Sequence, residues 1–142
     1  QPADLVTRDA ELGLAWLRVR NSPKDLVFVD LANAGKIEPG LVFHTLLRSG
    51  DDWGSVPVWR PGLVLGEMRT PRHLFLVDGL PGLAFDSEAR PIGFVDLNLD
   101  VVKNARGGGM GLDPGFNLQL TPIDKIAQAT AQAAKLPVVA GK

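Results

Sequence analysis

Hydrophobic positions along the chain fall in short runs rich in Val, Leu and Phe, and 16 glycines and 11 prolines punctuate these runs. Turn residues at this spacing are typical of β-barrels and β-sandwiches, so the pattern predicts an all-β fold. The predicted strands cover residues 4–8, 14–20, 42–48, 58–67, 73–77, 83–86, 92–99 and 116–120.

One segment, 121–135, changes its period from that of a strand to that of a helix. Thr121 suits the N-cap, Pro122 the first helical position and Asp124 the first turn. Apolar or small side chains recur on one face, at Ile123, Ile126, Ala127, Thr130 and Ala134. Pro137 disfavours helical geometry in the residue before it, so the pattern predicts one C-terminal helix that ends there.

The size and charge of the chain limit its architecture and its partners. Its 142 residues, 45% of them hydrophobic, suit one compact domain or part of a larger one. The formal charge is −1, from 15 basic and 16 acidic residues. The chain therefore has no excess of basic side chains that would attract nucleic acid or an anionic membrane. Apolar runs such as 26–29 and 41–43 are far shorter than the roughly 20 residues of a membrane-spanning helix. We therefore expect neither nucleic-acid binding nor membrane insertion.

Residue types that build metal and cofactor sites are scarce. The sequence has no cysteine, which excludes disulfides, thiolate metal sites and a cysteine nucleophile but assigns no compartment. Its two histidines share no repeated spacing that would indicate a metal site. The segment 107–111, GGGMG, fits neither glycine-rich phosphate motif and is interpreted as a flexible connector. We expect no cofactor and no metal.

The N-terminal segment carries a family resemblance. From Ala3 onward, ADLVTRDAELGLAWLRV resembles, without a gap, the block A-x-V-V-x-x-D-P-x-T-D-L-A-V-L-K-V of trypsin-like serine proteases of the bacterial high-temperature-requirement type. In that family, the Asp before L-A-V-L-K is the carboxylate of the catalytic triad, which orients the imidazole. The matching position in this sequence is Gly13.

Further blocks follow in the order found in that family. FVDLANAGKIEPGLVFHTL resembles its linker into the second barrel, with Leu31, Ile37 and Gly40 at the matching places. GLVLGEM and LFLVDG resemble its strands G-I-V-S and F-I-Q-T-D-A, and GFNLQLTPIDKIAQA resembles its last strand and closing helix. The resemblance covers residues 3–136, nearly the whole chain.

The nucleophile block of the family falls on a turn without a serine. When FDSEARPIGF is aligned with L-D-x-x-G-x-V-V-G-I, the motif G-N-S-G-G-P falls on Asp78, Gly79, Leu80, Pro81, Gly82 and Leu83. Leu80 takes the place of the nucleophilic serine, and the carboxylate of Asp78 would repel a developing oxyanion. With Gly13 and Leu80 at the positions of the triad Asp and Ser, the resemblance assigns no catalytic residue.

The resemblance implies an all-β, chymotrypsin-like fold of the PA clan, with two barrels in the complete family. Here it implies strands of an incomplete first barrel, a second six-stranded barrel, a C-terminal α-helix and a tail, at residues 1–24, 25–120, 121–136 and 137–142. The family's histidine lies well upstream of the first block, whereas His44 and His73 follow that block. Because the chain begins with Gln1 and not with Met, we expect that a signal peptide, an upstream domain or a chosen boundary accounts for its start.

Four residues are candidates to replace the missing chemistry, and each has a structural interpretation. Ser55 lies in a polar loop and is interpreted as a turn residue, and Ser87 as an exposed hairpin tip. His44 lies in an apolar strand pattern and is interpreted as a structural histidine. His73, next to an arginine, is interpreted as the start of a strand at the surface.

Two further features allow both a structural and a functional interpretation. Asp51 and Asp52 suggest carboxylate or calcium chemistry, yet a solvated hairpin tip explains them as well, and we favour the tip. Trp16 is expected in the core, whereas Trp53 is expected to be an exposed anchor in a loop.

Peptide binding does not require the missing triad. In the resembled family, substrate runs antiparallel to the strand just after V-V-G-I, which here places Asp96, Leu97 and Asn98 beside an extended peptide. Asp78 and Gly79 complete the candidate peptide-binding residues. We therefore predict a catalytically inactive trypsin-like domain, a pseudoprotease, that acts as a protein-binding, peptide-binding or scaffolding module.

Several alternatives stay open. The chain is either this inactive module or a fragment of an active or divergent serine endopeptidase, and a chance likeness would leave an unrelated small β-barrel. Unpaired edges of strands 3–20 predict association with an N-terminal fragment or with another copy of the chain. The compartment is unknown, although the resemblance points to a periplasmic or extracytoplasmic one.

Overall fold

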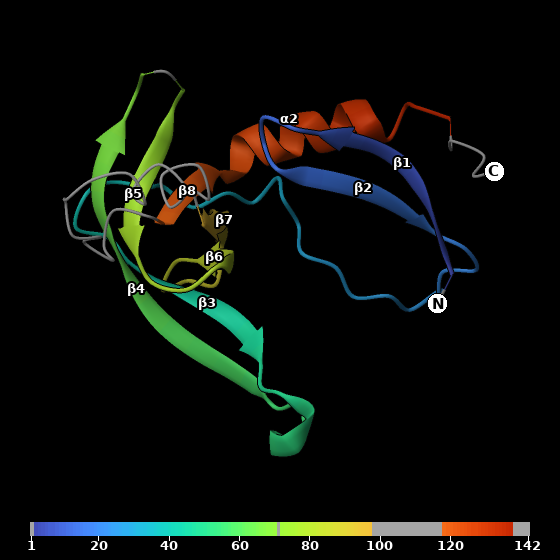
Figure 1. The fold of residues 1–142 in the computed structure, drawn as a ribbon, viewed down its shortest axis with the longest axis horizontal. Helices are drawn as coiled ribbons and strands as arrows, with labels where there is room; N and C mark the ends of the chain where they lie inside the picture. Colours follow the sequence, from blue (N-terminus) through green and yellow to red (C-terminus); the bar gives the residue numbers. More distant parts are fainter. Residues whose placement is uncertain (1, 71, 98–117, 138–142) are drawn as a thin grey trace, which may run out of the picture.

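The computed structural model describes residues 2–70, 72–97 and 118–137. In chain order they form β1 (Ala3–Asp9), β2 (Leu14–Val19), β3 (Val42–Arg48), the 3-10 helix η1 (Asp51–Trp53), β4 (Pro57–Met68), β5 (Leu74–Asp78), β6 (Gly82–Phe85), β7 (Pro91–Leu97), β8 (Leu118–Pro122) and α2 (Ile123–Ala133) (Figure 1). Each predicted strand is confirmed to within a few residues. Asn98, the predicted strand residues 116–117, the glycine-rich segment 107–111 and the tail 138–142 lie outside the described residues.

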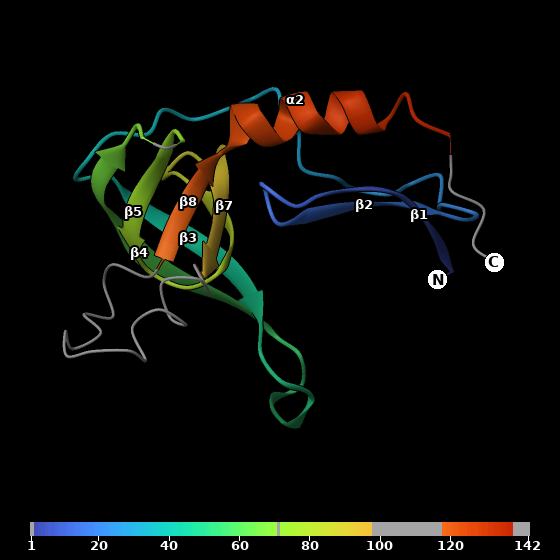
Figure 2. The ribbon, with the colours of Figure 1, turned by 45° about the horizontal axis from the view of Figure 1, so that its top comes forward.

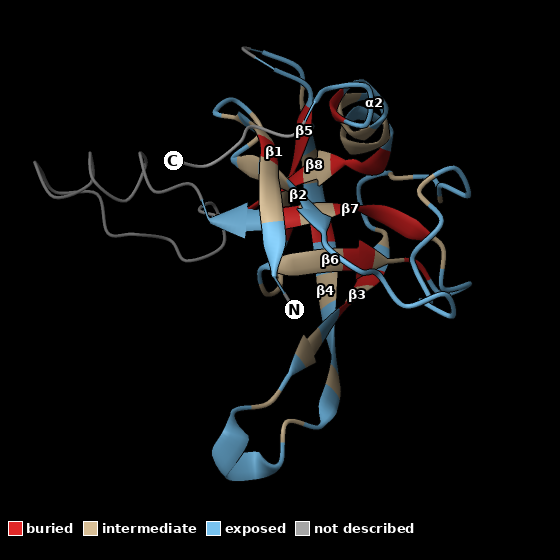
Figure 3. Ribbon diagram, turned by 90° about the vertical axis from the view of Figure 1, so that its right-hand side faces the viewer, coloured by how far each residue is buried: buried red, intermediate tan, exposed pale blue. Residues whose placement is uncertain are grey.

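Six strands close into an antiparallel barrel in the order β3-β4-β5-β8-β7-β6 (Figure 2). The pairing of β3 with β6 closes the barrel. Buried apolar side chains from these strands fill its interior, among them Phe43, Val64, Val77, Ile92, Val95 and Leu120. Figure 3 shows that the buried residues gather in the barrel strands and at the start of α2. The predicted six-stranded barrel is therefore confirmed.

Two glycines let the barrel strands approach closely. A Cβ atom at Gly62 would lie 2.4 Å from Cζ of Phe43, and one at Gly93 would lie 2.4 Å from Cδ2 of Leu120. Both distances are far below van der Waals contact, so any larger residue would displace a core side chain. The glycines therefore make room for Phe43 and Leu120 in the barrel interior.

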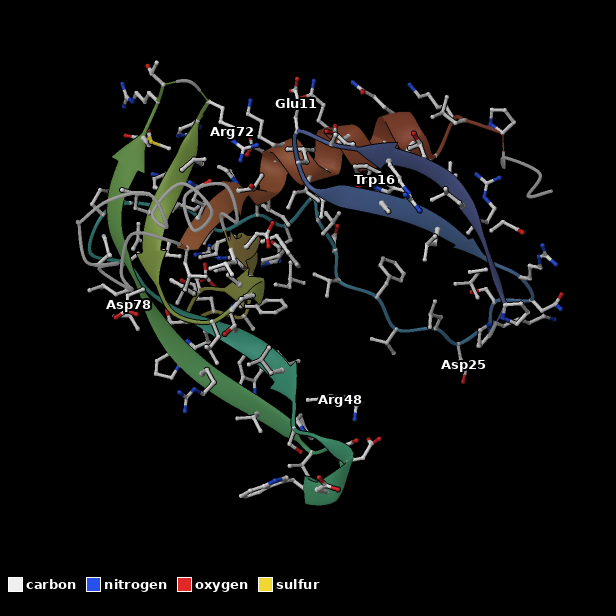
Figure 4. The ribbon with its side chains drawn as sticks, in the orientation of Figure 1. Glu11, Trp16, Asp25, Arg48, Arg72 and Asp78 are labelled. Atoms are coloured by element: carbon white, nitrogen blue, oxygen red, sulfur yellow. The ribbon has the colours of Figure 1, made fainter. Side chains whose placement is uncertain are left out.

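β1 and β2 form a separate two-stranded sheet beside the barrel (Figures 1 and 2). In their turn, Oδ1 of Asp9 accepts hydrogen bonds from the backbone N–H groups of Glu11 and Leu12 at 2.9 and 3.0 Å, and Gly13 has a φ of 66°. Arg72, which precedes β5, donates to the carbonyl oxygen of Glu11 (Figure 4). This contact attaches the turn of the hairpin to the barrel.

The predicted C-terminal helix is α2, which lies along the hairpin (Figure 1). It begins at Ile123, and its N-cap is Pro122, with φ −58° and ψ 144°. The prediction that Thr121 caps the helix is wrong, because Thr121 is held in β8 by pairing with Phe94 of β7. Among the described residues, no helix is long and apolar enough to cross a membrane.

A buried carboxylate organises the turn between β6 and β7. Asp86 is 7% exposed; its Oδ1 accepts from the backbone N–H groups of Glu88 and Arg90, and its Oδ2 accepts from Nε of Arg90 at 2.8 Å. Burial by itself would raise the pKa of Asp86. The backbone N–H and guanidinium of Arg90, together with the Glu88 amide, outweigh burial and hold this pKa below its ordinary value.

Candidate functional site

The turn from β5 to β6 carries Leu80, the residue that the sequence resemblance aligns with the family's nucleophile. β5 ends at the exposed Asp78, which pairs with Leu63, and Leu80 is half-buried between the two strands. A Cβ atom at Gly79 would lie 3.0 Å from Cζ of Phe43, so the turn backbone packs against the barrel core. Leu80 offers neither a hydroxyl to attack nor a proton to transfer, so this turn has no nucleophilic side chain at its tip.

The hairpin turn brings Gly13 next to β7. A Cβ atom at Gly13 would lie 3.4 Å from Oδ2 of Asp96, so these two residues from distant parts of the sequence are neighbours. The carboxylate of Asp96 thus stands beside Gly13, the residue that the sequence resemblance aligns with the triad acid. No pattern in the sequence indicates this proximity, because it depends on how the hairpin sits against the barrel.

The end of β7 has a side without a strand partner among the described residues. Asp96 pairs with Gln119 and Leu97 with Leu118 of β8, whereas the pairing of β7 with β6 ends at Val95. Within the described residues, the main chain of Asp96 and Leu97 therefore has no strand partner on the β6 side. The Leu97 N–H donates instead to Oδ1 of its neighbour Asp96 at 2.8 Å. Backbone groups at an open strand end can accept an added strand.

The two histidines lie in different surroundings. His44 sits on the outward side of β3, between the buried Phe43 and Thr45, and its ring packs edge-on against Trp59 with centroids 6.3 Å apart. His73 Nε2 lies 2.9 Å from Oε1 of Glu67, in an exposed contact at the surface of the barrel. The Arg69 guanidinium, and after it His73, lower the pKa of Glu67 against the opposing effect of burial. Both placements agree with the structural interpretation of these residues.

Ser55, Ser87, Asp51 and Asp52 lie in turns or loops. The Ser55 hydroxyl donates to Oδ1 of Asp51 at 2.7 Å in the loop between β3 and β4, and Asp52 is exposed beside it. Ser87 is exposed in the turn that Asp86 organises. In the part of the chain that the structure describes, no three His, Asp or Glu side chains gather as metal ligands would. The interpretation of residues 51 and 52 as a solvated hairpin tip is confirmed.

Comparison with known proteins identifies the fold. No protein-family model and no curated protein matches the sequence. Among solved structures, the MamO protease domain from Magnetospirillum magneticum, in its apo form, superposes with a TM-score of 0.63 and 16% sequence identity, covering 90% of this chain and 67% of that chain. At this identity the likeness concerns the fold alone. The chain therefore has the trypsin-like fold that its barrel and closing helix suggest.

Proposed function

We propose that this chain is a catalytically inactive trypsin-like domain of the high-temperature-requirement type, which binds a protein or an extended peptide. The observation that carries the proposal is the pair Leu80 and Gly13, which stand where the family has its nucleophile and its acid. A leucine cannot form an acyl-enzyme, and a glycine cannot orient an imidazole. In this proposal, residues 1–24 represent strands of an incomplete first barrel, and residues 25–120 the second barrel.

Peptide capture would use the open end of β7. An extended peptide added beside Asp96 and Leu97 would gain main-chain hydrogen bonds, which do not depend on a catalytic side chain. The Leu97 N–H would be one donor to such a peptide, which would displace the Asp96 carboxylate that accepts this N–H in the structure. The neighbouring turn at Asp78 and Gly79 would flank the same peptide.

Absence of catalysis is measured with a fluorophosphonate probe and with casein. The purified chain is expected to remain unlabelled by the probe and to leave casein intact, because Leu80 has no nucleophilic oxygen. Trypsin serves as the positive control. Labelling or turnover would favour the rival interpretation as a divergent endopeptidase. If Ser87→Ala then abolished that activity, Ser87 would be its nucleophile.

Peptide binding is measured by the fluorescence anisotropy of fluorescein-labelled casein peptides. We expect saturable binding that Leu97→Pro weakens at least tenfold, because proline removes the N–H donor that an added strand would use. Leu97→Ala is the matched control, which keeps the donor and is expected to bind as the parent chain does. Equal binding by the proline and alanine variants would contradict strand addition at this edge.

We also propose that strands 3–20 form an association surface for an N-terminal fragment or for another copy of the chain. The two-stranded sheet has no further strand on either edge within the described residues, and Leu17 and Val19 on β2 are 62% and 42% exposed. Open edges with apolar side chains favour pairing with another chain. Light scattering that gives a mass of 15.2 kDa at every concentration would contradict association with another copy.

A further inference from the structure

The longest barrel hairpin extends beyond the barrel as an arm. β3 meets β6 only at His44 and Thr45, and β4 pairs with β5 from Leu63 onward. In the part of the chain that the structure describes, the pairs from Leu46↔Trp59 to Arg48↔Pro57 have no further strand beside them. We call residues 46–59 the arm, and Figures 1 and 3 show it projecting away from the barrel as a mostly exposed ribbon.

The tip of the arm has a defined conformation. The N–H groups of Trp53 and Gly54 donate to the carbonyl oxygens of Gly50 and Asp51, both at 2.9 Å. Arg48 donates to the carbonyl oxygen of Ser55 at 2.9 Å, closing the loop from its other side. These bonds hold the 3-10 turn and fix the backbone that carries Trp53. A side chain presented on such a backbone loses little further conformational freedom when it binds.

The arm presents apolar surface to solvent. Trp53 is 79% exposed at the tip, and Trp59, Val56 and Leu46 are 53%, 50% and 41% exposed along the ribbon. A two-stranded ribbon without a covering layer is marginally stable on its own, and exposed apolar groups lower its solubility. Tryptophan is also the residue type most enriched among the residues that dominate binding energy at protein interfaces. The arm therefore has the composition of a docking element.

A pocket on another face of the molecule is lined mostly by apolar side chains and by one basic side chain, which complement the tryptophan and the two acids at the tip of the arm. It has a volume of about 400 Å³ and lies between the hairpin and α2, with Val6, Trp16, Leu17, Ala133 and Ala134 among its lining residues. Nε1 of Trp16 already donates to Thr130, so the indole contributes its apolar ring to the pocket (Figure 4). The exposed Arg18 also lines the pocket and supplies a positive charge. An aromatic side chain flanked by acids would suit this pocket.

We propose that Trp53 of one copy docks into the hairpin–helix pocket of a second copy, with Asp51 and Asp52 facing Arg18. The arm projects from the barrel away from the hairpin and α2, so its tip lies far from the pocket of its own molecule (Figures 1 and 2). This inference rests on the proposed association through strands 3–20. It specifies that the arm of a second copy is what binds there. It does not depend on peptide capture at β7.

Sedimentation velocity over a concentration series tests this docking. The weight-average mass is expected to rise above 15.2 kDa with concentration. Trp53→Ala is expected to weaken the self-association constant by about thirtyfold or more, as loss of a dominant interface residue does. Phe28→Ala is the matched control, since Phe28 is also 79% exposed but lies in the linker before β3, and it is expected to associate like the parent chain.

A mixing experiment identifies the two surfaces separately. Ala134→Phe fills the pocket from the exposed C-cap position of α2 and leaves the arm intact, whereas Trp53→Ala removes the anchor and leaves the pocket intact. Each variant alone is expected to stay monomeric, and their mixture to form heterodimers, because one supplies the arm and the other the pocket. Arg18→Glu is a second pocket variant, for use if Ala134→Phe lowers the melting temperature.

The outcomes separate the specific docking from the broader proposal. A parent chain that stays monomeric at all concentrations would overturn both the arm docking and the association of strands 3–20 with another copy. Undiminished association of Trp53→Ala would overturn the arm docking while leaving association through strands 3–20 in place. A mixture that associates no more than its components, although the parent chain associates, would also overturn the docking.

Discussion

At the scale of single residues, Asp86 illustrates how one buried charge is maintained. Its carboxylate accepts three hydrogen bonds from Glu88 and Arg90, and these offset the cost of its burial. A Cβ atom at Gly35 would lie 2.4 Å from Oδ2 of Asp86, so the preceding linker also packs directly on this group. Asp86 therefore has a structural role, which is to organise the turn between β6 and β7.

The depressed pKa of Asp86 predicts an acid-dependent loss of stability. Because the folded pKa lies below the ordinary value of about 4, the stabilisation is fully present above about pH 5 and is lost as the pH falls through the folded pKa. Asp86→Asn is expected to cost about 1.5–3 kcal/mol at pH 7, since it weakens hydrogen bonds to a charged group. This cost should shrink progressively below pH 4, as measured by urea unfolding.

The control for this prediction is Glu88→Gln in the same turn. Glu88 pairs with Arg90 at 3.2 Å, but its side chain is 68% exposed, so the substitution is expected to change stability little. A cost for Asp86→Asn that stayed constant from pH 7 to pH 3 would show that the carboxylate charge contributes nothing.

At the scale of elements, the hairpin β1–β2 is the least integrated part of the described fold. It belongs to its own sheet and contacts the rest through few polar links, among them Trp16 to Thr130 on α2 and Arg72 to the carbonyl of Glu11. The barrel, in contrast, is closed and has a continuous buried core. Elements with few buried contacts open more readily than the core does.

Trp16→Phe is expected to loosen the hairpin without affecting the barrel. The substitution removes a part-buried hydrogen bond worth about 1 kcal/mol, so the protected hairpin amides should exchange with deuterium about fivefold faster. Hydrogen exchange followed by mass spectrometry measures both regions in one experiment. Trp59→Phe, on β4, is the matched control and should leave the hairpin rates unchanged. Equal acceleration in β5, β7 and β8 would contradict the independence of the hairpin.

At the scale of the whole molecule, the sequence predicts the barrel better than the site. Short apolar runs between turn residues predict the strands because burial in a barrel leaves a local pattern, and the residues at 121–135 predict the helix because they follow a different period. The neighbours Gly13 and Asp96, and the pocket between hairpin and α2, leave no such pattern. They arise from segments that are distant in sequence, so only the assembled fold shows them.

The separate positions of the arm and the pocket limit the assemblies that the proposed contact can form. Because the contact joins unlike surfaces, each added subunit presents a fresh arm at one end and an empty pocket at the other. Growth would then stop only when a ring closes, and otherwise would continue into a filament. Subunits that lack Trp53 can still receive an arm but cannot pass the contact on, so a small proportion of them would act as terminators and set the length of the polymer.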